Sequence, residues 1–181
     1  MKDNQRVILT KRLLKDGLLR LLKTKELDKI NISELCRESG INRATFYRHY
    51  ESAHDVLVDL EMDLIRDIDV LSSGLKTLSD AKQYLEMLCT YLYERSDLIK
   101  TLIRCNTDAD FAQLMNEFYQ RLLTLKGDLP EFRDLDPDSL KLISTYLAGG
   151  GYFLMRSWLV EDIPKTPKEI TELVFRFTNE R

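Results

Sequence analysis

The sequence has few glycines and prolines: 7 Gly and 4 Pro, together 11 of its 181 residues. That share is about half of the roughly 12% that is typical of soluble proteins. A β-sandwich or β-barrel needs many Gly- and Pro-containing turns, and a parallel α/β fold needs glycine-rich loops between its strands and helices. The scarcity disfavours both classes, and we expect an all-α fold.

Cysteines and long apolar runs are scarce as well. Cys36, Cys89 and Cys105 are widely spaced and odd in number, which gives neither a disulfide framework nor a zinc-binding pattern. No apolar run approaches the roughly 18 to 20 residues of a membrane span. The polar N-terminus also lacks the apolar stretch of a secretion signal. We therefore expect a reduced, cytoplasmic chain with no membrane partner.

The sequence has only two histidines, His49 and His54. Because none follows residue 54, a Ser–His or Cys–His nucleophilic pair is not available in the rest of the chain. Their spacing of five residues does not place two metal ligands on one helical face. The glycines at 149–151 lack the Lys and Ser/Thr of a phosphate-binding P-loop. The sequence predicts no enzyme, no metal site and no cofactor.

The net charge of −3 conceals an asymmetry along the chain. Residues 1–59 hold 12 Lys+Arg and 9 Asp+Glu, a balance of +3. The remaining residues hold 15 Lys+Arg and 21 Asp+Glu, a balance of −6. A basic segment attached to an acidic one suggests that the basic segment meets a polyanion, although a difference of this size also arises by chance.

A helix-turn-helix motif is predicted over about residues 31–50. Asn31 can cap its first helix, and Glu34 follows in capping-box spacing. Gly40 can adopt the left-handed backbone that ends this helix. Asn42 can cap a second helix of about eight residues. Two short helices joined by a tight, glycine-containing turn form this motif.

Helices are also predicted on both sides of the motif. Residues 6–23 show apolar side chains at helical spacing, and the missing side chain of Gly17 would let another helix approach closely. Ser52 and Asp55 repeat the capping-box spacing and open a helix over about 53–71.

The second helix of the motif has an apolar side and a polar side. Phe46 and Tyr50, four residues apart, share one face and are expected to anchor the helix. The side chains directed elsewhere are Arg43, Ala44, Tyr47 and Arg48. A low, polar and basic face near a helix N-terminus suits insertion into a DNA major groove, and an ordinary solvated surface is the alternative.

The stretch 32–50 resembles the signature of the tetracycline-repressor (TetR) family of bacterial transcriptional regulators. The segments 45–47 (Thr-Phe-Tyr) and 49–50 (His-Tyr) match the family pattern directly, and Asn42 stands where a capping Ser is usual. The similarity covers about residues 7–65. It implies a homodimeric, DNA-binding regulator that acts as a repressor on a pseudo-palindromic operator.

The resemblance also implies roles for individual residues. The expected DNA-binding residues are Ser33, Asn42, Arg43, Ala44, Thr45, Tyr47, Arg48 and His49. Ser33 stands where the first helix of the motif directs its N-terminus to a phosphate. Arg43, Ala44 and Thr45 occupy the turn that faces the bases.

The other matched positions concern the DNA backbone. Tyr47 and His49 correspond to positions that usually touch phosphates, whereas Arg48 can reach either a base or a phosphate. One position departs from the family pattern. The family commonly has a Lys after the Ser that caps the next helix, but this chain has Ala53, followed by His54. That phosphate contact is therefore in doubt.

We expect two domains: a DNA-binding domain over 1–52 and a helical dimerisation and effector-binding domain over 53–181, with about nine helices in all. A helix is predicted over about 137–160, and three glycines at 149–151 interrupt its side chains. Glycines inside a helix are costly, so they indicate either close contact with another helix or a break between two shorter helices.

In the TetR family the last two helices of each subunit form a four-helix dimer interface. The resemblance therefore implies an interface made by Gly149, Gly150, Gly151, Phe153, Trp158, Leu173 and Phe177. The Gly-Gly…Trp segment and the following Pro-x-Glu-aliphatic segment also resemble a C-terminal domain of such regulators in Gram-positive bacteria.

An unidentified small-molecule effector could release the operator. The aromatic and sulfur-containing side chains that could line its pocket, or simply fill a core, are Tyr84, Cys89, Tyr93, Phe111, Met115, Phe118 and Tyr146. Two other functions remain open: a TetR-like coactivator that acts through a protein partner without binding an operator itself, and a small-molecule-binding protein with no regulatory role.

Overall fold

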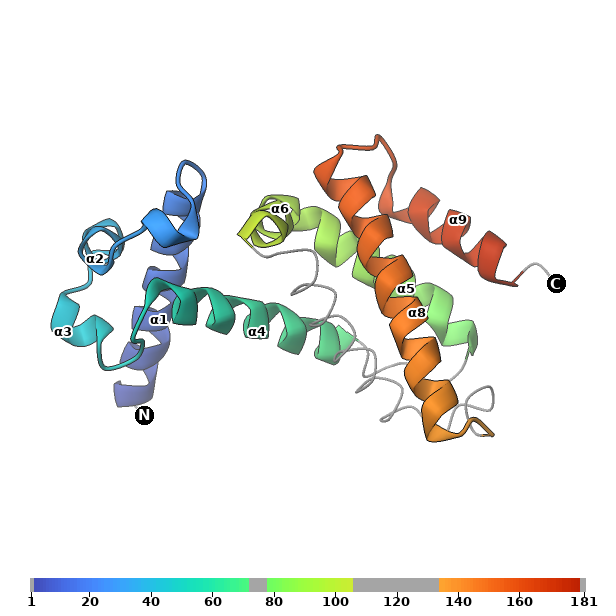
Figure 1. Cartoon of the computed structure of the whole chain (residues 1–181), viewed down its shortest axis with the longest axis horizontal. Helices are drawn as coiled ribbons and strands as arrows, with labels where there is room; N and C mark the ends of the chain where they lie inside the picture. Colours follow the sequence, from blue (N-terminus) through green and yellow to red (C-terminus); the bar gives the residue numbers. More distant parts are fainter. Residues whose placement is uncertain (1, 72–77, 106–133, 180–181) are drawn as a thin grey trace. The chain divides into compact units, whose positions relative to one another are not determined.

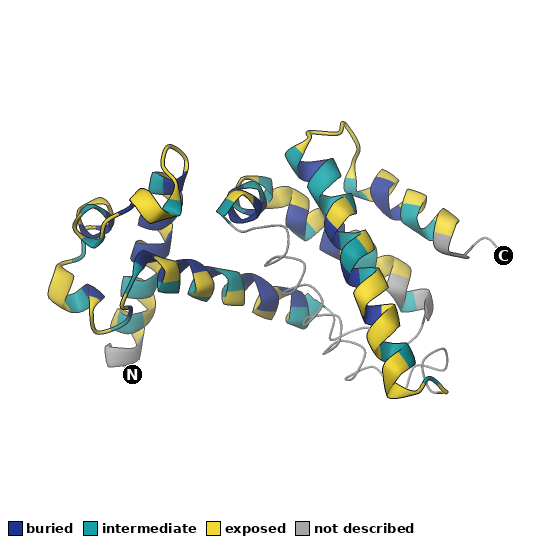
Figure 2. Cartoon of the chain, in the orientation of Figure 1, coloured by how far each residue is buried: buried dark blue, intermediate teal, exposed yellow. Residues whose placement is uncertain are grey.

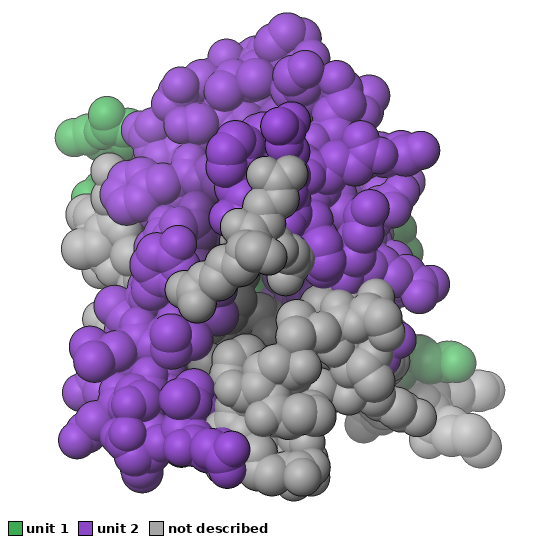
Figure 3. Space-filling model, turned by 90° about the vertical axis from the view of Figure 1, so that its right-hand side faces the viewer, with its two compact units in different colours: residues 1–64 green, residues 65–181 purple. Residues whose placement is uncertain are grey.

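The computed structural model describes residues 2–71, 78–105 and 134–179. Within these ranges it contains helices and no strand (Figure 1), so the all-α prediction is confirmed. The chain divides into two compact units, residues 1–64 and 65–181 (Figure 3). None of the helices in the described ranges is long and apolar enough to cross a membrane.

Unit 1 is built from α1 (Lys2–Leu22), α2 (Ile32–Ser39), α3 (Arg43–Phe46) and the first part of α4 (Ala53–Leu71), with a 3₁₀ turn over Leu27–Lys29. The fully buried side chains that form its core are Leu14, Leu18, Leu35, Phe46 and Val56 (Figure 2). They come from all four helices, so a single apolar core holds the unit together.

The predicted close approach at Gly17 is confirmed. A Cβ atom added to Gly17 in α1 would lie 2.1 Å from Oγ of Ser39, in the last turn of α2. That distance is far shorter than a van der Waals contact, so the absence of a side chain lets α1 and α2 pack together.

The short helices of unit 1 are capped as the sequence predicts. The side chain of Asn31 accepts a hydrogen bond from the backbone N–H of Glu34, and Asn42 accepts one from Thr45. Gly40 ends α2 with a φ of 67°. At the start of α4, Ser52 and Asp55 exchange backbone-to-side-chain hydrogen bonds of 3.0 and 3.2 Å.

Two expectations about this region are corrected. The Glu34 carboxylate pairs with Lys25, at 2.5 Å, and does not complete the predicted capping box with Asn31. The helix predicted from Arg43 to Tyr50 is α-helical only to Phe46. Its backbone continues in tighter turns, with Arg48 N–H donating to the Thr45 carbonyl group.

Unit 2 contains the rest of α4, then α5 (Leu78–Glu94), α6 (Ser96–Cys105), α8 (Pro137–Met155), the π-helical turn η3 (Arg156–Val160) and α9 (Pro167–Asn179). α5 packs along α9, and α6 packs against η3. Trp158 is buried beside them, stacked on the ring of Tyr93, and its indole N–H donates to the Lys165 carbonyl group at 2.8 Å.

The helix predicted over 137–160 is present, with its last five residues in the π-helical turn. Asp136 caps it, because its side chain accepts hydrogen bonds from the backbone N–H groups of Asp138 and Ser139. α8 runs through the glycines at 149–151 without interruption, so the alternative of a break there is wrong. Thr166 and Glu169 form a capping box at the start of α9, with hydrogen bonds in both directions.

Candidate DNA interface

Residues 43–50, which comprise α3 and the turns after it and are called the recognition segment below, present the side that the sequence predicts. Phe46 is fully buried and Tyr50 nearly so, with their rings 6.0 Å apart. The side chains of Arg43, Ala44, Tyr47 and Arg48 are exposed, and those of Thr45 and His49 are half-buried. The two aromatic side chains thus anchor the segment to the rest of unit 1, and its other side presents a polar, basic surface to solvent.

Arg43 and Tyr47 form a pair on this surface. The Arg43 guanidinium donates to the Tyr47 hydroxyl at 3.3 Å and lies 5.9 Å from the centre of its ring. That hydrogen bond raises the pKa of Arg43. Tyr47 keeps 51% of its surface exposed, so its hydroxyl is not part of the buried core and is available to a partner.

The cationic side chains of unit 1 fall into two groups. One group is neutralised within the protein, because each member pairs with an aspartate or glutamate: Lys11, Arg12, Lys15, Arg20 and Lys25. Arg37, Arg43 and Arg48 form no ion pair in the described part of the chain. Arg6, Lys23 and Lys29, in and after α1, are likewise exposed and form no ion pair in these ranges. Within the helix-turn-helix itself, the unpaired cationic side chains are the three arginines of α2 and the recognition segment.

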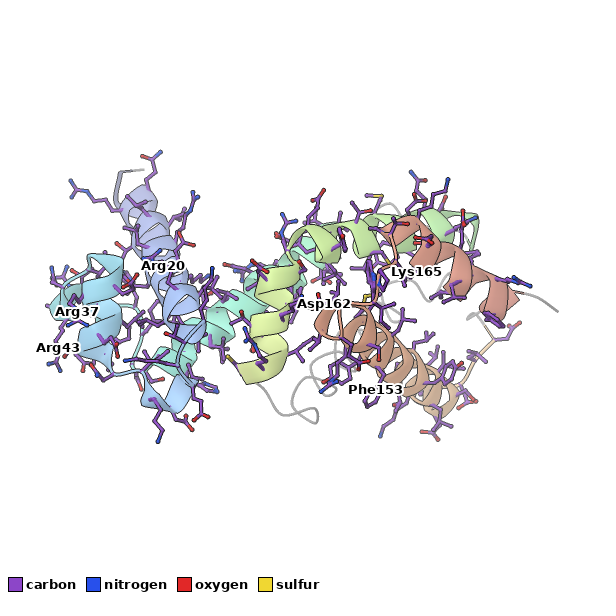
Figure 4. The ribbon with its side chains drawn as sticks, turned by 90° about the horizontal axis from the view of Figure 1, so that it is seen from above. Arg20, Arg37, Arg43, Phe153, Asp162 and Lys165 are labelled. Carbon is purple, nitrogen blue, oxygen red and sulfur yellow. The ribbon has the colours of Figure 1, made fainter. Side chains whose placement is uncertain are left out.

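Arg37 was missed by the sequence analysis. It is exposed on α2, and Figure 4 shows Arg37 and Arg43 at the same end of unit 1. Its position one helical turn after Ser33 was a usable signal. Arg37, Arg43 and Arg48 are called the cationic edge below. The net charge of +3 over residues 1–59 did not reveal this edge, because it counts paired and unpaired basic residues alike.

Two further predicted positions lie at helix starts. Ser33 is exposed in the first turn of α2. Ala53, which stands where the family commonly has Lys, is buried at the start of α4, while His54 beside it is exposed. Only His54 could replace the missing contact.

The predicted dimer residues of α8 and α9 are mostly at the surface. Phe153 is 59% exposed and Phe177 is 75% exposed, and Leu173 is exposed one turn before Phe177. A Cβ atom added to Gly149 or Gly150 meets no described atom within 4 Å. The expected close helix contact at these glycines is thus not made within the described part of the chain.

Trp158 differs from the other predicted dimer residues, since it is buried in the core of its own unit. The face of α8 that carries Phe153 also includes two residues left out of that prediction, Leu142 and Tyr146. Tyr146 is 72% exposed. The spacing of Leu142, Tyr146, Gly150 and Phe153 places them on one side of the helix.

The predicted effector-pocket residues that the structure describes do not line a common hollow. Phe111, Met115 and Phe118 lie outside the described residues. Tyr93 lines a hollow of about 400 Å³ together with Lys100 and Trp158. A second hollow, of about 600 Å³, runs along α5 and includes Met87 and Tyr91. The predicted residues that line neither hollow are Tyr84, Cys89 and Tyr146.

Cys89 is fully buried, and its burial raises the pKa of its thiol to about 11. It contacts Thr171, another fully buried residue, which lies in α9. Its position is thus that of a packing residue between α5 and α9. No group of three or more His, Cys, Asp and Glu side chains that could hold a metal ion occurs in the described ranges.

Comparison with known proteins agrees with these features. Residues 79–180, more than half of the chain, match a TetR-type family described as the transcriptional regulator C-terminal region. A curated relative is the uncharacterised HTH-type transcriptional regulator YxbF of Bacillus subtilis, which is 21% identical over 92% of this chain. The chain spans 44% of the length of that relative.

Two solved structures share the fold. A protein of Syntrophomonas wolfei assigned to the TetR family has a TM-score of 0.70, at 18% identity over 93% of this chain and 92% of its own. A TetR transcriptional regulator of Streptococcus agalactiae has a TM-score of 0.65, at 19% identity over 96% of this chain and 95% of its own. The family match, which covers residues outside the helix-turn-helix, confirms the resemblance seen in the sequence: this chain belongs to the TetR family of transcriptional regulators.

Proposed function

We propose that the chain is a repressor that binds operator DNA through α2 and the recognition segment. The observation that carries the proposal is the edge formed by Arg37, Arg43 and Arg48, which have no carboxylate partner in the described structure. Contacts between such arginines and DNA phosphates supply much of the affinity for DNA. A guanidinium can also donate two hydrogen bonds to one guanine in the major groove.

The roles within the edge follow from its geometry and from the family. Arg43, at the start of the recognition segment, reads a base, and the neighbouring Ala44 and Thr45 leave room for base edges. Tyr47 and His49 contact the backbone, as does Ser33 at the N-terminus of α2, where backbone N–H groups favour an anion. Contacts of this second kind position the protein without selecting a sequence.

The chain acts as a homodimer in this proposal. Operator half-sites lie about one helical turn or more apart. A two-fold dimer holds its two copies of unit 1, the two reading units, at a fixed spacing. The exposed apolar faces of α8 and α9 support a seam made by Leu142, Tyr146, Phe153, Leu173 and Phe177. Trp158 supports this seam from within the protomer.

An unidentified small molecule would regulate binding by favouring one spacing of the two reading units over the other. Such a regulator works in the cytoplasm, where the chromosome lies. The rival function, a coactivator that does not bind an operator, draws on Ala53 and the modest charge of the first segment. The unpaired arginine edge counts against it.

The test is an electrophoretic mobility shift with the full chain, using DNA from upstream of its own gene and random DNA at one stated salt concentration. The proposal predicts a complex with the upstream DNA that survives an excess of random competitor. Equal competition by both DNAs would show that the upstream DNA contains no specific operator. The absence of any complex at low salt would favour the coactivator function.

A further inference from the structure

One carboxylate in unit 1 joins three helical segments. Asp59, in α4, accepts hydrogen bonds from the Tyr50 hydroxyl at 2.6 Å and from Lys11 Nζ at 3.1 Å. Nζ of Lys15 lies 3.1 Å from the same oxygen and also pairs with Asp63. Lys11 and Lys15 belong to α1, whereas Tyr50 ends the recognition segment.

The charges in this cluster cancel, because two lysines face two aspartates. Lys15 keeps only 9% of its surface exposed, and Lys11 lies over the Tyr50 ring, 5.2 Å from its centre. Both ammonium groups are therefore committed inside unit 1 and are not free to bind phosphates. The cluster is part of the frame behind the DNA-reading edge.

The ionisation of the cluster is stable at physiological pH. Burial raises the pKa of Asp59, but the hydrogen bonds from Tyr50, Lys11 and Lys15 outweigh it and lower the pKa to about 2. Burial, followed by the hydrogen bond and the charge of Asp59, raises the pKa of Tyr50 above its ordinary value. The phenol stays a donor and the carboxylate an acceptor.

The recognition segment needs such a frame. α3 is only four residues long, far too short to be stable alone. Phe46 anchors it by apolar packing, which has no strong directional preference. The Tyr50 hydroxyl adds a directional bond at the other end of the segment, where the Tyr50 N–H also donates to the Phe46 carbonyl group.

We infer that Asp59 is a positioning residue for DNA reading, because it holds the recognition segment in one orientation through Tyr50. The DNA-reading part of this inference rests on the proposed function, whereas the ordering of the segment does not. Loss of the Tyr50 hydroxyl should loosen residues 41–50 while the buried ring keeps unit 1 folded.

The test is amide hydrogen exchange on the full chain with Tyr50→Phe. Tyr91→Phe is the matched control, since the Tyr91 hydroxyl donates to Asp67 at the same distance, 2.6 Å, in unit 2. A hydrogen bond to a charged group supports an increase of about tenfold in the exchange of residues 41–50, and the control should leave that segment unchanged. An unchanged segment, or a uniform rise throughout unit 1, would overturn the inference.

Asp59→Asn is the second variant, and it keeps the inference testable if Tyr50→Phe does not fold. Because the amide leaves Lys11 and Lys15 without a shared charge, exchange should rise in both α1 and residues 41–50. A rise in α1 alone would contradict the role of Asp59 toward the recognition segment.

Operator binding by the same variants tests the reading step separately. Base contacts depend on geometry more than phosphate contacts do, so Tyr50→Phe should weaken operator binding about fivefold and random-DNA binding less than twofold. Equal losses on both DNAs would contradict a role in base reading. If the wild-type chain binds neither DNA, the proposed function fails, and hydrogen exchange still decides whether Asp59 orders the segment.

Discussion

The two units present surfaces of opposite character. Unit 1 offers a cationic edge on short, side-chain-capped helices, and it neutralises most of its remaining basic residues internally. Unit 2 exposes large apolar side chains on two long helices, α8 and α9. A cationic edge suits a polyanion, whereas exposed apolar helix faces suit a second protein surface. This difference fits the proposed function, in which one chain binds two kinds of partner.

The largest effect is expected at the proposed seam of unit 2. The Cβ atom that Gly150→Leu adds meets no described atom of its own chain within 4 Å, and Leu favours helix over Gly by about 0.8 kcal/mol. At the proposed seam the new side chain would overpack a partner copy, at roughly 1 to 3 kcal/mol per site and twice per dimer. Light scattering should show a shift from about 42 kDa toward the 21.2 kDa of one chain, with operator binding falling as well.

Thr90→Leu, on the exposed side of α5, is the control for this experiment. It adds a similar side chain away from the seam and should leave the dimer intact. If Gly150→Leu remains a full dimer with raised thermal stability, the glycines do not lie at the interface.

A second prediction sharpens the role of unit 1. Arg43→Ala should weaken operator binding by roughly 1 to 3 kcal/mol through a lost base contact, and random-DNA binding by less. Fluorescence anisotropy with both DNAs measures the difference. Equal losses would reassign Arg43 to the DNA backbone.

A third prediction concerns packing within unit 1. Gly17→Ala should lower its stability by roughly 1 to 3 kcal/mol, less the gain in helix propensity, because the new Cβ meets Ser39. The buried Ser39 hydroxyl has no hydrogen-bond partner in the described structure. Ser39→Ala should therefore stabilise by up to about 1 kcal/mol and partly rescue Gly17→Ala. Thermal melts of both variants and their combination decide this, and a neutral Gly17→Ala would contradict the close approach.

Short-range features of the fold could be predicted from the sequence. Asn31, Asn42 and Asp136 each cap a helix by bonding an N–H within three residues, and the boxes at Ser52 and Thr166 are equally local. Residue type and spacing determine such bonds almost alone. The helix-turn-helix and its exposed face were accessible for the same reason.

Long-range features could not be predicted in this way. The Asp59 cluster joins residues 48 positions apart in sequence, so no local pattern reveals it, and the early end of α3 also escaped prediction. The ion pair between Lys25 and Glu34, nine residues apart, likewise takes the Glu34 carboxylate away from the predicted capping box. Trp158 fits a surface pattern as well as a core pattern, and only its stacking on Tyr93 of α5 and the packing of α6 against η3 distinguish them.

The smallest effect is expected when a paired and an unpaired arginine of unit 1 are compared for their contribution to DNA binding. Arg37→Ala should weaken binding to operator and random DNA by a similar factor of a few and make the salt dependence shallower by about one phosphate contact. Arg20→Ala is the matched control, because Arg20 already pairs with Glu38. A slope that changes equally in both variants would contradict the division into two groups.

The central claim is that a dimer held together by unit 2 binds one operator with its two copies of unit 1. Its most direct test is a hydroxyl-radical footprint of the full chain on its own upstream DNA. We expect two protected patches related by two-fold symmetry, with half-site centres one helical turn of about 10.5 base pairs apart, or a multiple of it. A single patch at saturating protein, or protection without symmetry, would contradict it.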